Sequence, residues 1–283
     1  MSDARCRHHW LRGAMGNARL RERRKARFLR ENPICCFCGG KAVATTWDHV
    51  PPRACFPNGH FPEEFEFPAC MSCNQGTRRH DQIFGLYVHL ADSNEENYDD
   101  PTVLRLARGV ANNDRDALPR LNLTANQKRA SLRQLGARRM PGEALRDVPL
   151  IHIPPAFNDA AISIARKLAC ALYYRESHGR ILSHGHRIAV GWNQLQNPRF
   201  APMVRFFIER LPDQTIGMRP NLAQPGRRFG YKSGLNEIED FFIYAAQFGA
   251  GMVLWGIVTP PGKTTSEPLR SIEHTVFGPT SEP

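Results

Sequence analysis

The hydrophobic pattern of the C-terminal half predicts one long helix followed by several strands. Apolar side chains recur at helical spacing over residues 158–177, and Asn158 is the residue expected to cap this helix. Residues 187–192 have the composition of a strand. Two further apolar runs, residues 241–248 and 252–258, flank a Gly-Ala-Gly turn and predict an antiparallel hairpin.

Shorter segments of the same kind predict the elements of the remaining chain. The apolar and β-branched residues 43–47 predict a strand, which Pro51 and Pro52 end. A loop rich in Pro, Gly and Phe is expected to follow as far as Pro68. Its phenylalanines are expected to form a small core: Phe56, Phe61, Phe65 and Phe67. Helices are expected at residues 18–31, 74–90, 102–111, 125–135 and 203–211.

Charge adds a class of partner to this picture. The 283-residue chain has a formal net charge of +11, which favours polyanionic partners, nucleic acid first. The longest apolar stretch, residues 249–258, is about half the length of a membrane span. Residues 1–30 lack the apolar core of a secretion signal. We therefore expect a soluble cytoplasmic protein with no membrane partner.

The basic residues are concentrated at the N-terminus. Residues 1–30 carry ten Arg or Lys against two acidic residues. Such an arm can follow the phosphates of a nucleic acid, or it can be a solvated tail. The side chains expected to contact nucleic acid here are Arg19, Arg23, Arg24, Lys25 and Arg27.

Two C-x-x-C pairs provide the chemistry. Cys35 and Cys38 form the first pair, and Cys70 and Cys73 form the second. Because intracellular thiols stay reduced, such pairs bind metal more often than they form disulfides, and four cysteines can hold one structural zinc ion. A redox C-x-x-C and a plain zinc ribbon are the alternatives, but two pairs argue against the first. The 31 residues between the pairs leave room for an inserted loop and argue against the second.

The other cysteines have less specific roles. Cys36 lies inside the first pair and is an alternative ligand to Cys35, although only Cys35 has the two-residue spacing to Cys38. Cys170 lies in the long apolar helix and is expected to be core.

Between the cysteine pairs lie residues suited to phosphodiester hydrolysis. His49 can take a proton near neutral pH, because imidazole titrates there. Asp48 is a hard oxygen ligand for Mg²⁺ or Mn²⁺, and Asn74 can offer its carbonyl oxygen to the same ion. Such an ion would polarise the scissile phosphate and stabilise the leaving oxygen.

The segment from Cys35 to Phe84 resembles the HNH endonucleases, also called His-Me or ββα-metal nucleases. The shared pattern is C-x-x-C, a strand, Asp48-His49, a loop, and C-x-x-C followed by Asn74 at the start of a helix. Residues 164–169 and 173–175 of this chain resemble, more weakly, the C-terminal region of the same proteins. The resemblance implies an endonuclease that hydrolyses phosphodiester bonds in DNA, with double-stranded DNA as its partner. It also implies that His49 is the general base and that Asp48 and Asn74 bind the catalytic Mg²⁺ or Mn²⁺.

One departure from the family pattern leaves a second hypothesis open. The Asn that braces the histidine loop in this family is missing from residues 63–67, and Asn58 is the nearest substitute. The alternative is therefore a catalytically inactive zinc module that binds nucleic acid or protein. Asp81 lies seven residues after Asn74 and is expected on the same helix face, as a brace, a ligand or a surface charge.

Arg78 and Arg79 lie between Asn74 and Asp81 in the predicted helix. They are expected either to face the phosphates or to be ordinary surface residues. No catalytic spacing occurs in the C-terminal half, which is expected to be a recognition or oligomerisation surface.

The predicted fold class is α+β, with a zinc-stapled ββα-metal module and an antiparallel sheet in the C-terminal region. Five segments are expected: a basic arm at 1–30, the HNH-like module at 31–92, a polar helical connector at 93–150, an α+β domain at 151–260, and a loosely ordered tail at 261–283.

Overall fold

The computed structural model describes most of the chain. The described residues are 19–56, 61–92, 100–120, 123–135, 142, 144–145, 152–194, 213–214, 229–249, 251–263 and 273–275. The helix predicted at 203–211 and the substitute residue Asn58 lie outside these ranges, as do residues 1–18 of the basic arm. The fold is mixed α+β with antiparallel sheets, as predicted.

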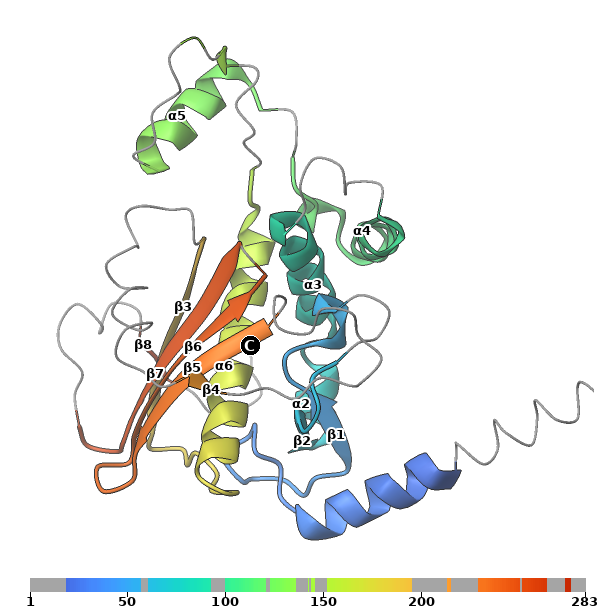
Figure 1. Ribbon diagram of the computed structural model, residues 1–283, viewed down its shortest axis with the longest axis vertical. Helices are drawn as coiled ribbons and strands as arrows, with labels where there is room; N and C mark the ends of the chain where they lie inside the picture. Colours follow the sequence, from blue (N-terminus) through green and yellow to red (C-terminus); the bar gives the residue numbers. More distant parts are fainter. Residues whose placement is uncertain are drawn as a thin grey trace, which may run out of the picture.

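A six-stranded antiparallel sheet forms the C-terminal part of the molecule (Figure 1). Its strands are β3 (Arg187–Gln194), β4 (Asp213–Gln214), β5 (Phe229–Asn236), β6 (Phe241–Phe248), β7 (Met252–Thr259) and β8 (Glu273–Thr275), in the order β4-β5-β6-β7-β3-β8. The predicted strand at 187–192 and the predicted hairpin are confirmed as β3 and β6–β7. The tail was expected to be loosely ordered, but it contributes β8, which pairs with β3 at the sheet edge.

Helix α6 (Pro155–Glu176) lies against this sheet and contacts β3, β6 and β7. The predicted cap at Asn158 is wrong, because the helix begins three residues earlier, with Pro154 at the cap and Pro155 in the first turn. The side chain of Asn158 instead accepts a hydrogen bond from Trp192 Nε1 at 3.1 Å. Asn158 thus helps to tie the helix to β3.

The N-terminal part contains a second, two-stranded antiparallel sheet. Strands β1 (Thr46–His49) and β2 (Glu66–Ala69) pair with Asp48 opposite Phe67. The prediction placed the first strand three residues too early and missed β2, which was expected to be loop. Val43 instead forms an isolated bridge with Ile34. Between the strands lies a 3₁₀ turn, η1 (Arg53–Cys55).

Two helices follow β2 rather than the single one predicted. The short helix α2 (Met71–Gln75) begins three residues before Asn74, and α3 (Arg78–Asp92) begins after a break at Gly76 and Thr77. Because of this break, Asn74 and Asp81 do not lie on one continuous helix face. The predicted helices of the connector are confirmed as α4 (Pro101–Asn113) and α5 (Ala125–Leu135), and η4 (Arg115–Ala117) follows α4.

The larger of two hydrophobic clusters among the described residues joins the two parts of the molecule. Helix α6 packs against α3 on one side and against the six-stranded sheet on the other (Figure 1). The expected small core of Phe56, Phe61, Phe65 and Phe67 is buried and belongs to this larger core, where Phe65 packs edge-on against Phe229 of β5. The module at 31–92 therefore rests on the C-terminal region through α6.

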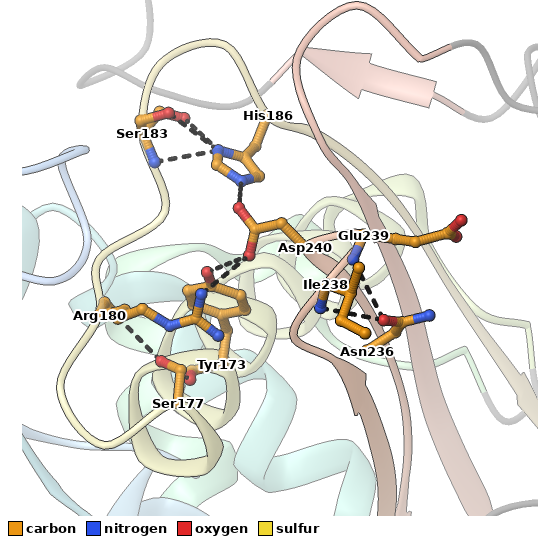
Figure 2. A network of polar contacts seen from close by, with 9 residues as sticks. All are labelled: Tyr173, Ser177, Arg180, Ser183, His186, Asn236, Ile238, Glu239 and Asp240. Carbon is orange, nitrogen blue, oxygen red and sulfur yellow. Dashed lines mark hydrogen bonds and ion pairs between the residues drawn. The ribbon is translucent and has the colours of Figure 1, made fainter.

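A polar network fastens the C-terminal end of α6 to the β5–β6 turn (Figure 2). Asp240, in the turn, accepts a hydrogen bond from Tyr173 at 2.6 Å and pairs with His186 at 2.8 Å. Arg180 forms a second ion pair with Asp240 at 3.6 Å. Ser183, His186 and Asp240 are residue types used for nucleophilic catalysis. Here, however, both the hydroxyl and the main-chain N–H of Ser183 contact His186 Nδ1, so the ring caps the turn at 183–186 and has a structural role.

In the part of the chain that is described, no helix combines the length and apolar character needed to cross a membrane.

Candidate metal centre and the Asp48–His49 site

Four cysteines from two separate loops meet at one point of the N-terminal module. The ligand atoms of Cys35, Cys38, Cys70 and Cys73 all lie within 4.8 Å of one another, and all four thiols are free. Tetrahedral zinc, with Zn–S bonds of about 2.3 Å, places its sulfur atoms about 3.8 Å apart, so the cluster has the right dimensions to hold a metal ion such as zinc. Cys36, the alternative ligand, is not part of this cluster and is fully buried in the hydrophobic core. Cys170 is also buried in that core, as expected.

The local backbone explains why these two loops form half-sites. After Cys38 the chain turns back through Gly39 and Gly40, both at positive φ, which glycine adopts without strain. Cys70 is the N-cap of α2, and its sulfur accepts a hydrogen bond from the main-chain N–H of Cys73 at 3.5 Å. Each of the two loops therefore places its own pair of sulfur atoms close together.

The electrostatics of the thiols also favour a cation. A hydrogen bond from Cys73 is the main reason that the pKa of Cys35 falls to about 5, while the same contact raises the pKa of Cys73. One thiolate is thus stabilised by a neighbouring thiol. A bound cation such as zinc would allow all four cysteines to ionise together.

Asp48 lies on β1 beside this cluster, and its side chain is buried. Its Oδ2 atom lies 2.5 Å from Nζ of Lys167, which comes from the middle of α6. Burial raises the pKa of Asp48, and the charge of Lys167 opposes that rise. The carboxylate expected to bind a catalytic divalent ion is therefore paired with a lysine from the C-terminal region.

Two more groups surround the same lysine. Lys167 Nζ donates a hydrogen bond to Oγ1 of Thr77, in the break between α2 and α3, at 2.7 Å. Burial raises the pKa of Asp81, in the first turn of α3, to about 6, with Lys167 acting in the opposite direction. Asp81 thus belongs to the polar cluster around Lys167 and not to the face that carries Asn74.

His49 follows Asp48 on β1 and points to the other side of the strand, as neighbouring strand residues do. Its ring packs edge-on against Phe61 at 4.8 Å between centroids. Its Nε2 atom lies 3.8 Å from Oε1 of Glu66, the residue opposite it on β2. The other carboxylate oxygen of Glu66, Oε2, pairs with Arg24.

Asn74 binds protein groups in this structure. Its side-chain amide donates to the main-chain oxygen of Trp47 at 3.3 Å and lies 3.5 Å from Oγ1 of Thr46. Asp48, His49 and Asn74 all lie at or beside β1, but they face three different environments.

The basic helix of residues 19–31 packs against this module. Arg24 pairs with Glu66 at 2.5 Å and lies over the ring of Trp47 at 5.3 Å, and Phe28 packs edge-on against the same ring. Of the other basic residues predicted to contact nucleic acid, Arg19, Arg23 and Arg27 are exposed and Lys25 is half-buried. Arg27 pairs with Glu31 along the helix.

The two arginines of α3 differ from each other. Both side chains are exposed, and that of Arg79 forms an ion pair with Asp114. The attachment of the basic helix and the pairing of Arg79 reduce the number of predicted residues that are available to a polyanion.

Sequence reasoning missed Lys167, Thr77 and Glu66. Lys167 had a detectable signal, because it is a charged residue within the apolar pattern of α6, among the buried Ala165, Leu168 and Ala169. A lysine at such a position requires a buried acceptor. Glu66 had no such signal, because its role depends on the pairing of β1 with β2.

No protein-family model, no curated protein and no solved structure matches this chain.

Proposed function

We propose that this chain is an HNH-type endonuclease that hydrolyses phosphodiester bonds in DNA. The observation that carries the proposal is the order of elements around the cysteine cluster: β1 ends in Asp48-His49, pairs with β2, and β2 leads through Cys70 into the helix that carries Asn74. A strand pair and a helix held by one metal form a rigid frame for a base at the end of β1.

His49 is the general base in this proposal. Hydrolysis requires a group that removes a proton from the attacking water near neutral pH, and imidazole is suited to this. Glu66, 3.8 Å from His49, is placed to stabilise the charged ring that proton transfer creates. The edge-on contact with Phe61 fixes the ring plane.

The Mg²⁺ or Mn²⁺ ion expected at Asp48 and Asn74 does not fit the site as it stands. An ammonium group lies 2.5 Å from the Asp48 carboxylate, at the distance of a direct ion pair. The amide of Asn74 is directed at the main chain of Trp47. The proposed chemistry therefore rests on His49, and no step is assigned to a divalent ion.

The proposed partner is double-stranded DNA, bound through the helix of residues 19–31. Arg19, Arg23, Arg27 and Arg30 recur every three or four positions and so lie along one side of the helix, where all four are exposed. Arg24 and Phe28 attach the helix to Trp47, one residue before Asp48. Phosphates bound by this row of arginines would lie near the end of β1.

The ion pair between Lys167 and Asp48 favours a second candidate function, a zinc module that binds nucleic acid without cutting it. In such a protein Asp48 has a structural role, as the buried partner of a lysine from α6. The cysteine cluster and the basic helix serve both functions equally. Only the chemistry at His49 separates them.

A plasmid-nicking assay tests the two functions. The parent protein is incubated with supercoiled DNA in Mg²⁺, in Mn²⁺ and in a chelator, alongside His49→Ala and the exposed-histidine control His152→Ala. The proposal expects nicking by the parent and by His152→Ala, and a loss of roughly two to four orders of magnitude in His49→Ala. Binding in gel shifts without nicking under any condition would identify the non-catalytic zinc module.

A further inference from the structure

Lys167 is a buried cation at the contact between the two parts of the molecule. Only 9% of its side-chain surface is exposed, and the corresponding value for Asp48 is 7%. Burying an ammonium group is costly unless charged or polar groups surround it. Its surroundings come from three separate elements: Asp48 on β1, Thr77 in the break before α3, and the ring of Phe37, whose centroid lies 5.6 Å away.

Two carboxylates lie around this one buried lysine. Asp48 and Asp81 both interact with Lys167, and the charge of Asp48 raises the pKa of Asp81, in addition to the larger effect of burial. Oδ1 of Asp81 is inaccessible to solvent and has no hydrogen-bond partner among the described residues. Two carboxylates thus share one ammonium group.

The oxygen atoms around Lys167 are those that divalent cations prefer. Mg²⁺ and Mn²⁺ bind through carboxylate and other oxygen atoms, and Asp48, Thr77 and Asp81 provide two carboxylates and a hydroxyl. In this protein the amine of Lys167 already lies against two of these residues, at 2.5 and 2.7 Å. The ammonium group therefore lies where a small divalent ion would have to lie to bind both Oδ2 of Asp48 and Oγ1 of Thr77.

We propose that the ammonium group of Lys167 takes the position of a divalent cation beside Asp48, so that the parent protein binds no Mg²⁺ or Mn²⁺ there. Removal of the amine opens a divalent-cation site formed by Asp48, Thr77 and Asp81. The inference does not depend on the proposed function, which assigns the chemistry to His49 and no step to Asp48. It also makes α6, and with it the C-terminal region, the element that controls metal access.

The test is Mn²⁺ binding by the zinc-loaded full chain, measured by thermal denaturation and by isothermal titration calorimetry. Lys167→Ala is compared with the parent, with Lys167→Ala/Asp48→Asn, and with Lys263→Ala, which removes an exposed lysine paired with Glu239. Zinc content is measured throughout, so that exchange at the cysteines is recognised. Lys167→Gln, which keeps most of the side-chain volume, replaces the alanine variant if that variant does not fold.

The parent and Lys263→Ala are expected to show no change in Tm with Mn²⁺ and no binding heat. Compared with the parent, Lys167→Ala is expected to have a lower Tm in buffer without Mn²⁺, a saturable rise in Tm of several degrees when Mn²⁺ is added, and a stoichiometry of one Mn²⁺ ion. The double variant should lose that response. Saturable Mn²⁺ binding by the parent that Asp48→Asn abolishes would overturn the inference, as would a folded Lys167→Ala or Lys167→Gln that does not bind.

A parallel nicking assay separates this inference from the proposed function. If Lys167→Ala binds Mn²⁺ and the parent cleaves no DNA, the cation site is supported and the endonuclease is contradicted. Cleavage by the parent that is lost in His49→Ala supports the endonuclease. If Lys167→Ala then binds no Mn²⁺, the cation site is contradicted while the endonuclease stands.

Discussion

The side-chain amide of Asn74 donates a hydrogen bond to the main-chain oxygen of Trp47 across 3.3 Å, which joins α2 to β1 next to Asp48. We expect Asn74→Ala to lower the free energy of unfolding by about 1 kcal/mol, because it leaves a main-chain oxygen without this donor. Zinc content should not change. Urea denaturation of Asn74→Ala is compared with that of Gln75→Ala, which alters the exposed neighbour on the same helix. An unchanged stability for Asn74→Ala would show that the hydrogen bond does not brace the strand.

The cysteine cluster predicts one zinc ion per chain. Cys73→Ser is expected to lose the metal and to loosen β1, β2 and α2, whereas α3 should stay folded because it packs against α6 in the hydrophobic core. Metal analysis and hydrogen exchange measure the two effects. Cys170→Ala, which alters a buried cysteine outside the cluster, should keep the metal. A metal-free parent protein, or a Cys73→Ser variant that keeps its zinc, would remove the basis of the proposed centre.

The exposed side of the basic helix is expected to set the salt dependence of DNA binding. Replacement of Arg19, Arg23 and Arg30 by Gln should weaken binding to all sequences and reduce the slope of log K against log salt by up to about three, near 0.9 for each phosphate that the helix no longer neutralises. Arg105→Gln is the control, because it removes an exposed arginine of α4. Fluorescence anisotropy at several salt concentrations gives the slopes. A slope equal to that of the parent would show that the helix does not contact phosphate.

Local sequence patterns predicted those parts of the fold that depend on nearby residues. The hairpin of β6 and β7, the strand β3 and the helices α4 and α5 all follow from periodicity and turn residues. The cysteine spacing likewise predicted the cluster, because each pair is a local loop. In contrast, β2 was missed since its sequence, Glu-Phe-Pro-Ala, contains a proline and is defined by pairing with β1.

The environment of the candidate site depends on contacts between distant residues. Lys167 meets Asp48 only because α6 packs against α3, and 119 positions separate the two residues. The brace formed by Asn74 and the break at Gly76 and Thr77 also depend on tertiary packing. Residue type alone therefore suggested a ligand where the structure shows an ion pair.

The polar network at Asp240, shown in Figure 2, acts as a clamp between the C-terminal end of α6 and the β5–β6 turn. Burial raises the pKa of Asp240, but hydrogen bonds from Tyr173 and His186, with the charge of Arg180 nearby, outweigh it and leave the pKa below its ordinary value. A carboxylate with a lowered pKa stabilises the fold above its ordinary pKa of about 4, and that contribution disappears as the pH falls through the folded value. Protonation of Asp240 should therefore loosen the end of α6 in acid.

We expect Asp240→Asn to be less stable than the parent at pH 7 and to approach it as the pH falls below about 4, where the parent loses the same charge. Asn suits the test, because residue 240 has φ of 51° and Asn tolerates the left-handed region. Urea denaturation between pH 7 and pH 3 gives the two stability curves. Glu239→Gln, which removes the charge of the exposed neighbour paired with Lys263, is the matched control and should follow the parent closely. Parallel curves for Asp240→Asn and the parent over the whole range would show that the charge of Asp240 does not hold the clamp.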